Sequence, residues 1–137
     1  MTYKTITDYL PIFAGKPAGR WVVDDHNAGT EAEPIDMAHV VYSDDVQDFI
    51  AVMTRFQKKN PLMGLRDFND ILKAYGIRWD LQDMQAVDLA RLDARGVLAL
   101  ILAAIESERF HDGALLSFFE SGSIQRWLER LAELDED

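Results

Sequence analysis

The chain has 137 residues, a length typical of one domain, and it carries 14 Lys and Arg against 24 Asp and Glu, for a formal net charge of −10. It has no cysteine, which excludes disulfide bonds, thiolate nucleophiles and cysteine-ligated zinc. The excess of negative charge disfavours nucleic-acid binding, because phosphate backbones are bound by a basic face.

The rest of the composition is typical of a globular protein. Apolar residues make up 48% of the chain, and its longest unbroken apolar run, residues 97–105, has nine residues. A membrane span needs roughly 18–20 residues, and the first residues lack the apolar stretch of a signal peptide. The absence of cysteine also fits a reducing compartment. We therefore expect a soluble, cytoplasmic protein.

The first third of the chain predicts a broken helix followed by a small sheet. Ile6, Tyr9, Leu10 and Phe13 recur with helical spacing, but Pro11 lies among them and should shorten or kink the helix. Residues 21–23 and 39–42 are β-branched and aromatic runs bounded by turn-forming residues. We predict that they form an antiparallel pair with a long connection.

The middle of the chain predicts two amphipathic helices. Ser43 is a typical N-cap, and the apolar face that follows it extends from residue 46 to residue 56, with Asn60-Pro61 as the stop. A second apolar stripe covers residues 68–75 and ends at Gly76, which suits a left-handed C-terminal position. Residues 83–92 predict at most a short helical turn.

The last third is dominated by a helix from about Asp93 to Glu108 or Arg109 that is apolar nearly all round, a pattern typical of a helix inside a core. A turn at residues 111–113, a short helix over 115–119 and a final amphipathic helix over 124–134 follow. Residues 135–137 are acidic at a helix C-terminus, so we expect them to fray. The predicted fold is mainly α: one domain over residues 1–137, with five or six helices around a central buried helix and a small two-stranded β element in the first third.

Residues 106–113 concentrate charged and polar side chains at the end of the apolar helix. In a functional interpretation, Arg109 binds a carboxylate or phosphate, and Glu108 or His111 acts as an acid or base. Together with Asp112, these are the candidate ligand-binding residues. No catalytic residue is assigned.

A structural interpretation of the same segment makes it a corner between helices. Here Asp112 is the N-cap of the next helix, and Arg109 pairs with a carboxylate or with the carbonyl end of the preceding helix. Gly113 permits the turn, and Phe110 is a core anchor.

A second candidate region is a long acidic stretch. No Lys or Arg occurs between Arg20 and Arg55. We select Asp24, Asp25, Asp44 and Asp45 as a candidate acidic interaction surface. His26 and His39 could add imidazole to such acids, but no motif with metal-ligand spacing is present, so we predict no metal and no cofactor.

Other functional motifs are missing. There is no glycine-rich phosphate loop and no Gly-x-Ser-x-Gly sequence. Arg126 and Arg130 of the last helix are offset by Glu129 and Glu133, which is poor for a DNA-recognition helix. Trp79 follows a Gly-ended helix and either lines a groove or packs into the core.

Several segments resemble one family of small bacterial proteins, the domain of unknown function 6508 family. They are Glu108-Arg-Phe-His-Asp-Gly113, Gly122-Ser-Ile124, Leu128-Glu-Arg-Leu131, Tyr9-Leu-Pro11 with Phe13, and Tyr42-Ser43. The resemblance covers nearly the whole chain. It implies a mostly helical bacterial domain and assigns no activity.

Two hypotheses for the function follow. The first is an acidic protein-interaction or regulatory module that binds a protein partner or itself, without nucleic acid or membrane. The alternative is a small-molecule-binding protein or enzyme with a polar site around Glu108, Arg109 and His111.

Overall fold

A buried helix, α6 (Ala94–Ser107), occupies the centre of the molecule in a computed structural model that describes residues 2–22 and 38–135. The side chain of Asp93 caps the helix by accepting a hydrogen bond from the Gly96 amide at 2.9 Å. Residues 96–104 are all buried. Because this helix has no polar face, it is stable only when neighbours cover every side of it.

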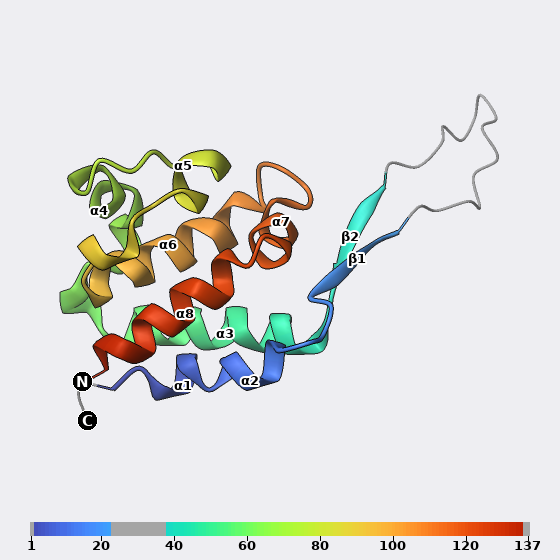
Figure 1. The fold of residues 1–137 in the computed structure, drawn as a ribbon, viewed down its shortest axis with the longest axis horizontal. Helices are drawn as coiled ribbons and strands as arrows, with labels where there is room; N and C mark the ends of the chain where they lie inside the picture. Colours follow the sequence, from blue (N-terminus) through green and yellow to red (C-terminus); the bar gives the residue numbers. More distant parts are fainter. Residues whose placement is uncertain (1, 23–37, 136–137) are drawn as a thin grey trace.

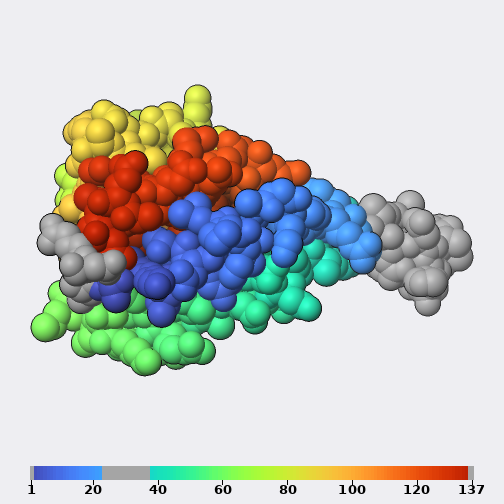
Figure 2. Space-filling model, turned by 60° about the horizontal axis from the view of Figure 1, so that its bottom comes forward, coloured from blue at the N-terminus to red at the C-terminus, as the bar shows by residue number. Residues whose placement is uncertain are grey.

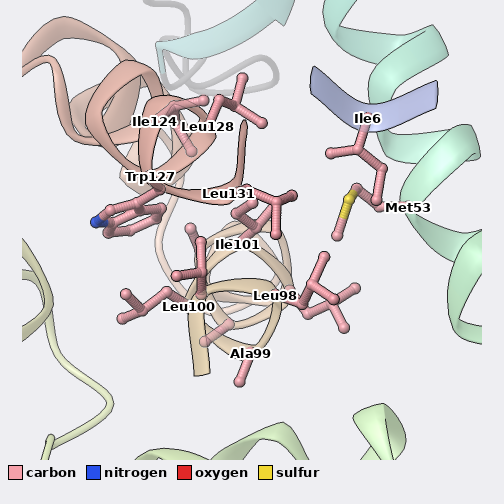
Figure 3. Packing of buried hydrophobic residues seen from close by; sticks show 14 of the residues in the cluster. Ile6, Met53, Leu98, Ala99, Leu100, Ile101, Ile124, Trp127, Leu128 and Leu131 are labelled. Carbon is pink, nitrogen blue, oxygen red and sulfur yellow. The ribbon is translucent and has the colours of Figure 1, made fainter. Parts of the chain in front are cut away.

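Figure 3 looks along α6 and shows its side chains pointing in several directions. Leu98 faces Ile6 and Met53, whereas Leu100 lies toward Trp127. Ala99, Ala103 and Ala104 are completely buried, and their small side chains allow neighbouring helices to approach closely. The prediction of a central apolar helix is confirmed.

The elements around α6 confirm the mainly helical fold with one small sheet. Within the described residues, their bounds are α1 (Lys4–Thr7), α2 (Tyr9–Phe13), β1 (Gly19–Val22), β2 (His39–Tyr42), α3 (Asp44–Lys59), η1 (Pro61–Met63), η2 (Leu65–Asp67), α4 (Phe68–Ala74), α5 (Leu81–Gln85), η3 (Leu89–Arg91), α7 (Ala114–Glu120) and α8 (Ser123–Leu134), where η denotes a 3-10 helix. The described chain is divided more finely than the expected five or six helices, because short pieces such as α1, α2 and α5 form separate turns.

The layers are formed by helices from distant parts of the sequence. α4 packs on one side of α6 and α8 on the other, while α1 lies between α8 and α3. Figure 2 shows the blue N-terminal helices lying against the red α8. On α8, the residues Ile124, Trp127, Leu128 and Leu131 are buried, as the one-sided apolar pattern predicted.

The first helical segment is broken, as Pro11 predicted. α1 ends at Thr7 and α2 begins at Tyr9. A proline ring clashes with the carbonyl group four residues earlier, which here belongs to Thr7, and proline cannot donate a hydrogen bond to that carbonyl. Pro11 itself is tolerated because it lies in the first turn of α2, where amides have no helical partner.

The helix α3 begins and ends where the sequence indicated. The Ser43 hydroxyl accepts a hydrogen bond from the Val46 amide at 3.2 Å, and Asp44 and Asp45 occupy the first turn. The backbone amide of Asn60 closes the last turn on Phe56. Val46, Phe49, Met53 and Phe56 form its buried face.

The two strands form an antiparallel ribbon that extends from the helical body (Figure 1). The register pairs Gly19 with Tyr42 and Trp21 with Val40. Side chains on paired residues share a face, so Tyr42, Trp21 and Val40 lie on one face. Arg20 and Val41 lie on the other.

The two ends of the described chain meet. The Asp135 carboxylate accepts hydrogen bonds from the Tyr3 amide at 2.9 Å and from the Thr2 hydroxyl at 3.0 Å. The sequence led us to expect a frayed end, but Asp135 is held in place by these two hydrogen bonds. The expectation differed because both partners come from the opposite end of the chain. Residues 136 and 137 lie outside the described residues.

Candidate functional site at the Glu108–Gly113 corner

The Glu108 carboxylate is the centre of a hydrogen-bond network at the corner between α6 and α7. Its oxygens accept hydrogen bonds from the Gly113 amide at 2.9 and 3.1 Å and from the Leu115 amide at 3.0 Å. The Tyr42 hydroxyl donates to Oε1 of Glu108 at 2.5 Å. The same hydroxyl accepts a hydrogen bond from the Leu116 amide at 2.9 Å.

This network satisfies the free amides at the start of α7. The first amides of a helix have no partner within the helix, and a carboxylate there also interacts favourably with the positive end of the helix dipole. Glu108 and Tyr42 together accept hydrogen bonds from Gly113, Leu115 and Leu116. Glu108 thus has a structural role that occupies both of its oxygens.

Asp112 does not cap this helix, so that prediction is wrong. The residue before α7 is Gly113, with φ of 88°, and no side chain of its own caps the helix. The two amides that an N-cap at Asp112 could bind are already bonded elsewhere, that of Ala114 to the His111 carbonyl and that of Leu115 to Glu108. Asp112 is exposed instead.

Tyr42 is neutral in this environment. Burial, and then its hydrogen bond to the Glu108 carboxylate, raise the pKa of Tyr42 well above that of an ordinary tyrosine. A neutral phenol can donate to Glu108 and accept from Leu116 at the same time. The β-ribbon is thereby joined to the start of α7 by a residue that lies 66 positions from Glu108.

Trp21 makes the second contact between the ribbon and this corner. A Cβ atom built on Gly113 would lie 2.3 Å from Cζ2 of Trp21, which is closer than any real contact. Gly113 is therefore required for two reasons: its backbone has positive φ, and the indole ring occupies the space of a side chain. Trp21 and Tyr42 reach the corner from the same face of the ribbon.

Arg109 faces a different direction from Glu108. Its guanidinium donates to Oε1 of Glu106 at 2.7 Å, in an i,i+3 pair on the outer surface. This matches the carboxylate pairing of the structural interpretation. Glu106 and Arg109 also line a groove between α3 and α4 that does not include Glu108 or His111.

Aromatic residues surround the end of α6 on the Arg109 side. The indole N–H of Trp79 donates to the Ala103 carbonyl and to Oγ of Ser107, both at 3.0 Å. The Trp79 ring packs edge-to-face against Phe68, with ring centroids 5.1 Å apart, and against Phe110 at 5.8 Å. Trp79 is therefore part of the outer core.

Phe110 is not a core anchor, contrary to the sequence prediction. It is 67% exposed. It lies three residues after the end of α6, and its ring packs edge-to-face on Trp79. The chain thus presents a large apolar ring to solvent beside Arg109.

His111 and Asp112 are both exposed, and their side chains make no hydrogen bond or ion pair within the described part of the chain. The structure does not bring Glu108, Arg109 and His111 together around one cavity. Across residues 2–22 and 38–135, no group of three or more His, Asp or Glu side chains could hold a metal ion.

The candidate acidic surface is described only in part. Asp44 is exposed on the first turn of α3, and Asp45 is 3.9 Å from Nζ of Lys16. Asp24 and Asp25, and also His26, lie outside the described residues. In the part of the chain that is described, no helix has the length and apolar character to cross a membrane.

Comparison with known proteins identifies a family. No curated protein and no solved structure is significantly similar to the chain. Residues 2–137 match DUF6508, which is described as a family of unknown function. This match covers the corner, the ribbon and the central helix together. The chain therefore belongs to the DUF6508 family.

Proposed function

We propose that this protein is a cytoplasmic, acidic protein-interaction or regulatory module of a bacterium. The observation that carries the proposal is the surface at the start of α3, where acidic side chains adjoin the exposed outer face of the β-ribbon. Charged surfaces of one sign attract partners of the opposite sign and increase their rate of association. The partner we propose has a basic contact surface.

The acidic part of this surface lies on α3. Asp44 and Asp48 are exposed there, and Asp45 is partly exposed. Lys16 approaches only Asp45, at 3.9 Å, and exposed pairs of this kind contribute little energy. The acidic groups are consequently available to a basic partner.

The apolar part of the surface lies on the ribbon. Val41 is 41% exposed on the outer face of the ribbon, which it shares with Arg20, and Trp21 is 52% exposed on the opposite face, where its ring packs on Gly113. Tyr42 and Trp21 hold the ribbon firmly against α7, so the exposed groups are presented on a fixed support. Aromatic side chains that are partly exposed on rigid elements are frequent anchors of protein interfaces.

Charge reversal tests the proposal. Immobilised wild-type protein and the variant Asp44→Lys with Asp48→Lys would be incubated with bacterial lysate at low and high salt, and retained proteins would be quantified by mass spectrometry. We expect the variant to lose a defined set of proteins that high salt also releases from the wild type. Sedimentation velocity would test self-association in the same two proteins.

A matched control is available on α4 and α7. Asp70 lies in the first turn of α4, as Asp44 does in α3, and Glu120 is exposed at the end of α7. The variant Asp70→Lys with Glu120→Lys changes the net charge equally at other places. Equal retention by all three proteins, together with unchanged sedimentation, would refute the proposed interaction surface.

A further inference from the structure

A large groove lies away from the acidic end, between the C-terminal half of α3 and the start of α4. Its volume is about 810 Å³. Its walls come from the last turns of α3, the η1–η2 segment, Phe68 and the end of α6. A volume of this size falls in the range of roughly 300–1,000 Å³ that is typical of sites for small organic ligands.

The charge of this groove is opposite to that of the molecule. Lys58, Arg66 and Arg109 line it, against the carboxylates of Asp67 and Glu106. The groove therefore carries more positive than negative groups on a chain whose formal net charge is −10. Lys58 and Arg66 are exposed and make no ion pair among the described residues.

One contact orients a cation of the groove, and a second supports its wall. Nη1 of Arg109 is held by Glu106 at 2.7 Å, so the other nitrogens of the guanidinium remain available as donors. Nε of Arg95 donates to the Met63 carbonyl at 2.6 Å, and a Cβ atom on the lining residue Gly64 would lie 3.1 Å from Nη2 of Arg95. Arg95 thus fixes the backbone of Met63 and lies beside Gly64, although its own side chain is not among the lining residues.

The groove also offers apolar surface beside these cations. Phe68 lines it above the buried Leu65, and Phe68 begins the aromatic row that continues through Trp79 to the exposed Phe110. Guanidinium groups bind carboxylates and phosphates through two parallel hydrogen bonds and also stack on flat rings. The combination is suited to a ligand with an anionic head and an apolar or planar body.

We propose that this groove binds a small organic anion, a phosphate ester or carboxylate carried on an apolar or aromatic body, with Arg66 and Arg109 as the principal anion-binding residues. Of the four candidate ligand-binding residues in the corner segment, this site uses only Arg109. It does not depend on the acidic interaction surface, which lies at the other end of α3.

NMR titration of the isotope-labelled full chain would test the site with three probes: phenyl phosphate, inorganic phosphate and phenol. We expect phenyl phosphate to shift the amide signals of Gly64 and Phe68 in a saturable way and to bind more tightly than inorganic phosphate. Phenol should produce no saturable shift at these amides. The variant Arg66→Gln should weaken phenyl phosphate binding about tenfold, and addition of Arg109→Gln should weaken it further.

The control removes equal charge elsewhere. Lys73 and Arg78 are exposed and do not line the groove, so Lys73→Gln with Arg78→Gln should leave the affinity for phenyl phosphate within about twofold, since only long-range screening changes. Circular dichroism of each variant confirms that the fold is retained. Three results would overturn the proposal: no saturable shift at the groove, equal affinity for phenol, or the same loss of affinity in the control variant.

Discussion

Replacement of Glu108 by alanine gives the most direct test of the corner network. The change removes the acceptor for the Gly113 and Leu115 amides and for the Tyr42 hydroxyl. A buried donor left without a partner costs about 1–3 kcal/mol. These groups are only partly buried, so water replaces part of the lost bonding, and the low end of that range applies to each donor.

The expected loss in the free energy of unfolding is therefore about 3 kcal/mol, with a further contribution of about 0.5 kcal/mol from the lost charge at the start of α7. For a chain of this size, a loss of 3 kcal/mol lowers the melting temperature by about 10 °C. Glu108→Gln keeps one acceptor oxygen and nearly the same volume, so its loss should be smaller, about 1–2 kcal/mol.

Urea denaturation followed by circular dichroism at 222 nm measures these losses. Asp112→Ala is the matched control, because Asp112 belongs to the same corner but is exposed and has no side-chain partner within the described residues. It should change the free energy of unfolding by less than about 0.5 kcal/mol. A Glu108→Ala variant as stable as the wild type, or an Asp112→Ala variant that is equally destabilised, would contradict the structural role of Glu108.

Three further predictions concern Tyr42, Gly113 and the core. Because the pKa of Tyr42 is raised in the folded state, its neutral hydroxyl should contribute fully to the free energy of unfolding below about pH 10, the ordinary tyrosine value. This contribution should be lost as the pH rises above that value. Urea titrations at several pH values should therefore show a shallower fall in stability for Tyr42→Phe than for the wild type. Gly113→Ala should lower the free energy of unfolding by about 2–4 kcal/mol in urea denaturation, because the backbone has positive φ and the new methyl group clashes with Trp21. In a double-mutant cycle, Trp21→Ala should relieve the clash and restore that part of the loss, but not the part due to the backbone. Leu98→Ala should lower the free energy of unfolding by about 2–5 kcal/mol because Leu98 is fully buried. Its control, Leu62→Ala at a fully exposed position, should lower it by less than about 0.5 kcal/mol. Similar melting temperatures for the two variants would contradict the central position of α6.

The features that could be predicted from the sequence are those determined by neighbouring residues. Ser43 and Asp93 cap helices through amides three residues later, and Pro11 breaks a helix one turn before it. The apolar pattern of α6 also specifies its environment, since such a helix can exist only inside a core. Each of these rules operates over one or two turns of chain.

Two roles at the corner were mispredicted, that of Asp112 as an N-cap and that of Phe110 as a core anchor. Asp112 satisfies the local rule for an N-cap, but the Leu115 amide that it would bind is bonded to Glu108, and the next amide, that of Leu116, is bonded to Tyr42. Only the fold brings Tyr42 to Leu116, so no spacing in the sequence reveals the contact. Phe110 was placed in the core from its side chain alone, although its position after the last turn of α6 leaves it exposed.

The groove at Arg109 was missed for the same reason. Its cations come from α3, from η2 and from the residues after α6, and they are separated in the sequence by acidic residues. The overall negative charge conceals a local excess of positive charge that becomes evident only when these elements are placed side by side. The sequence identified Arg109 but not its neighbours.

The hydrogen bonds that Asp135 accepts from Thr2 and Tyr3 place the beginning and the end of the described chain next to each other (Figure 1). A short flexible peptide could bridge this distance without crossing the core. Head-to-tail cyclisation should thus preserve the arrangement of the helices, and a circular permutant with new ends at the exposed turn around Leu62 should keep every layer around α6 intact.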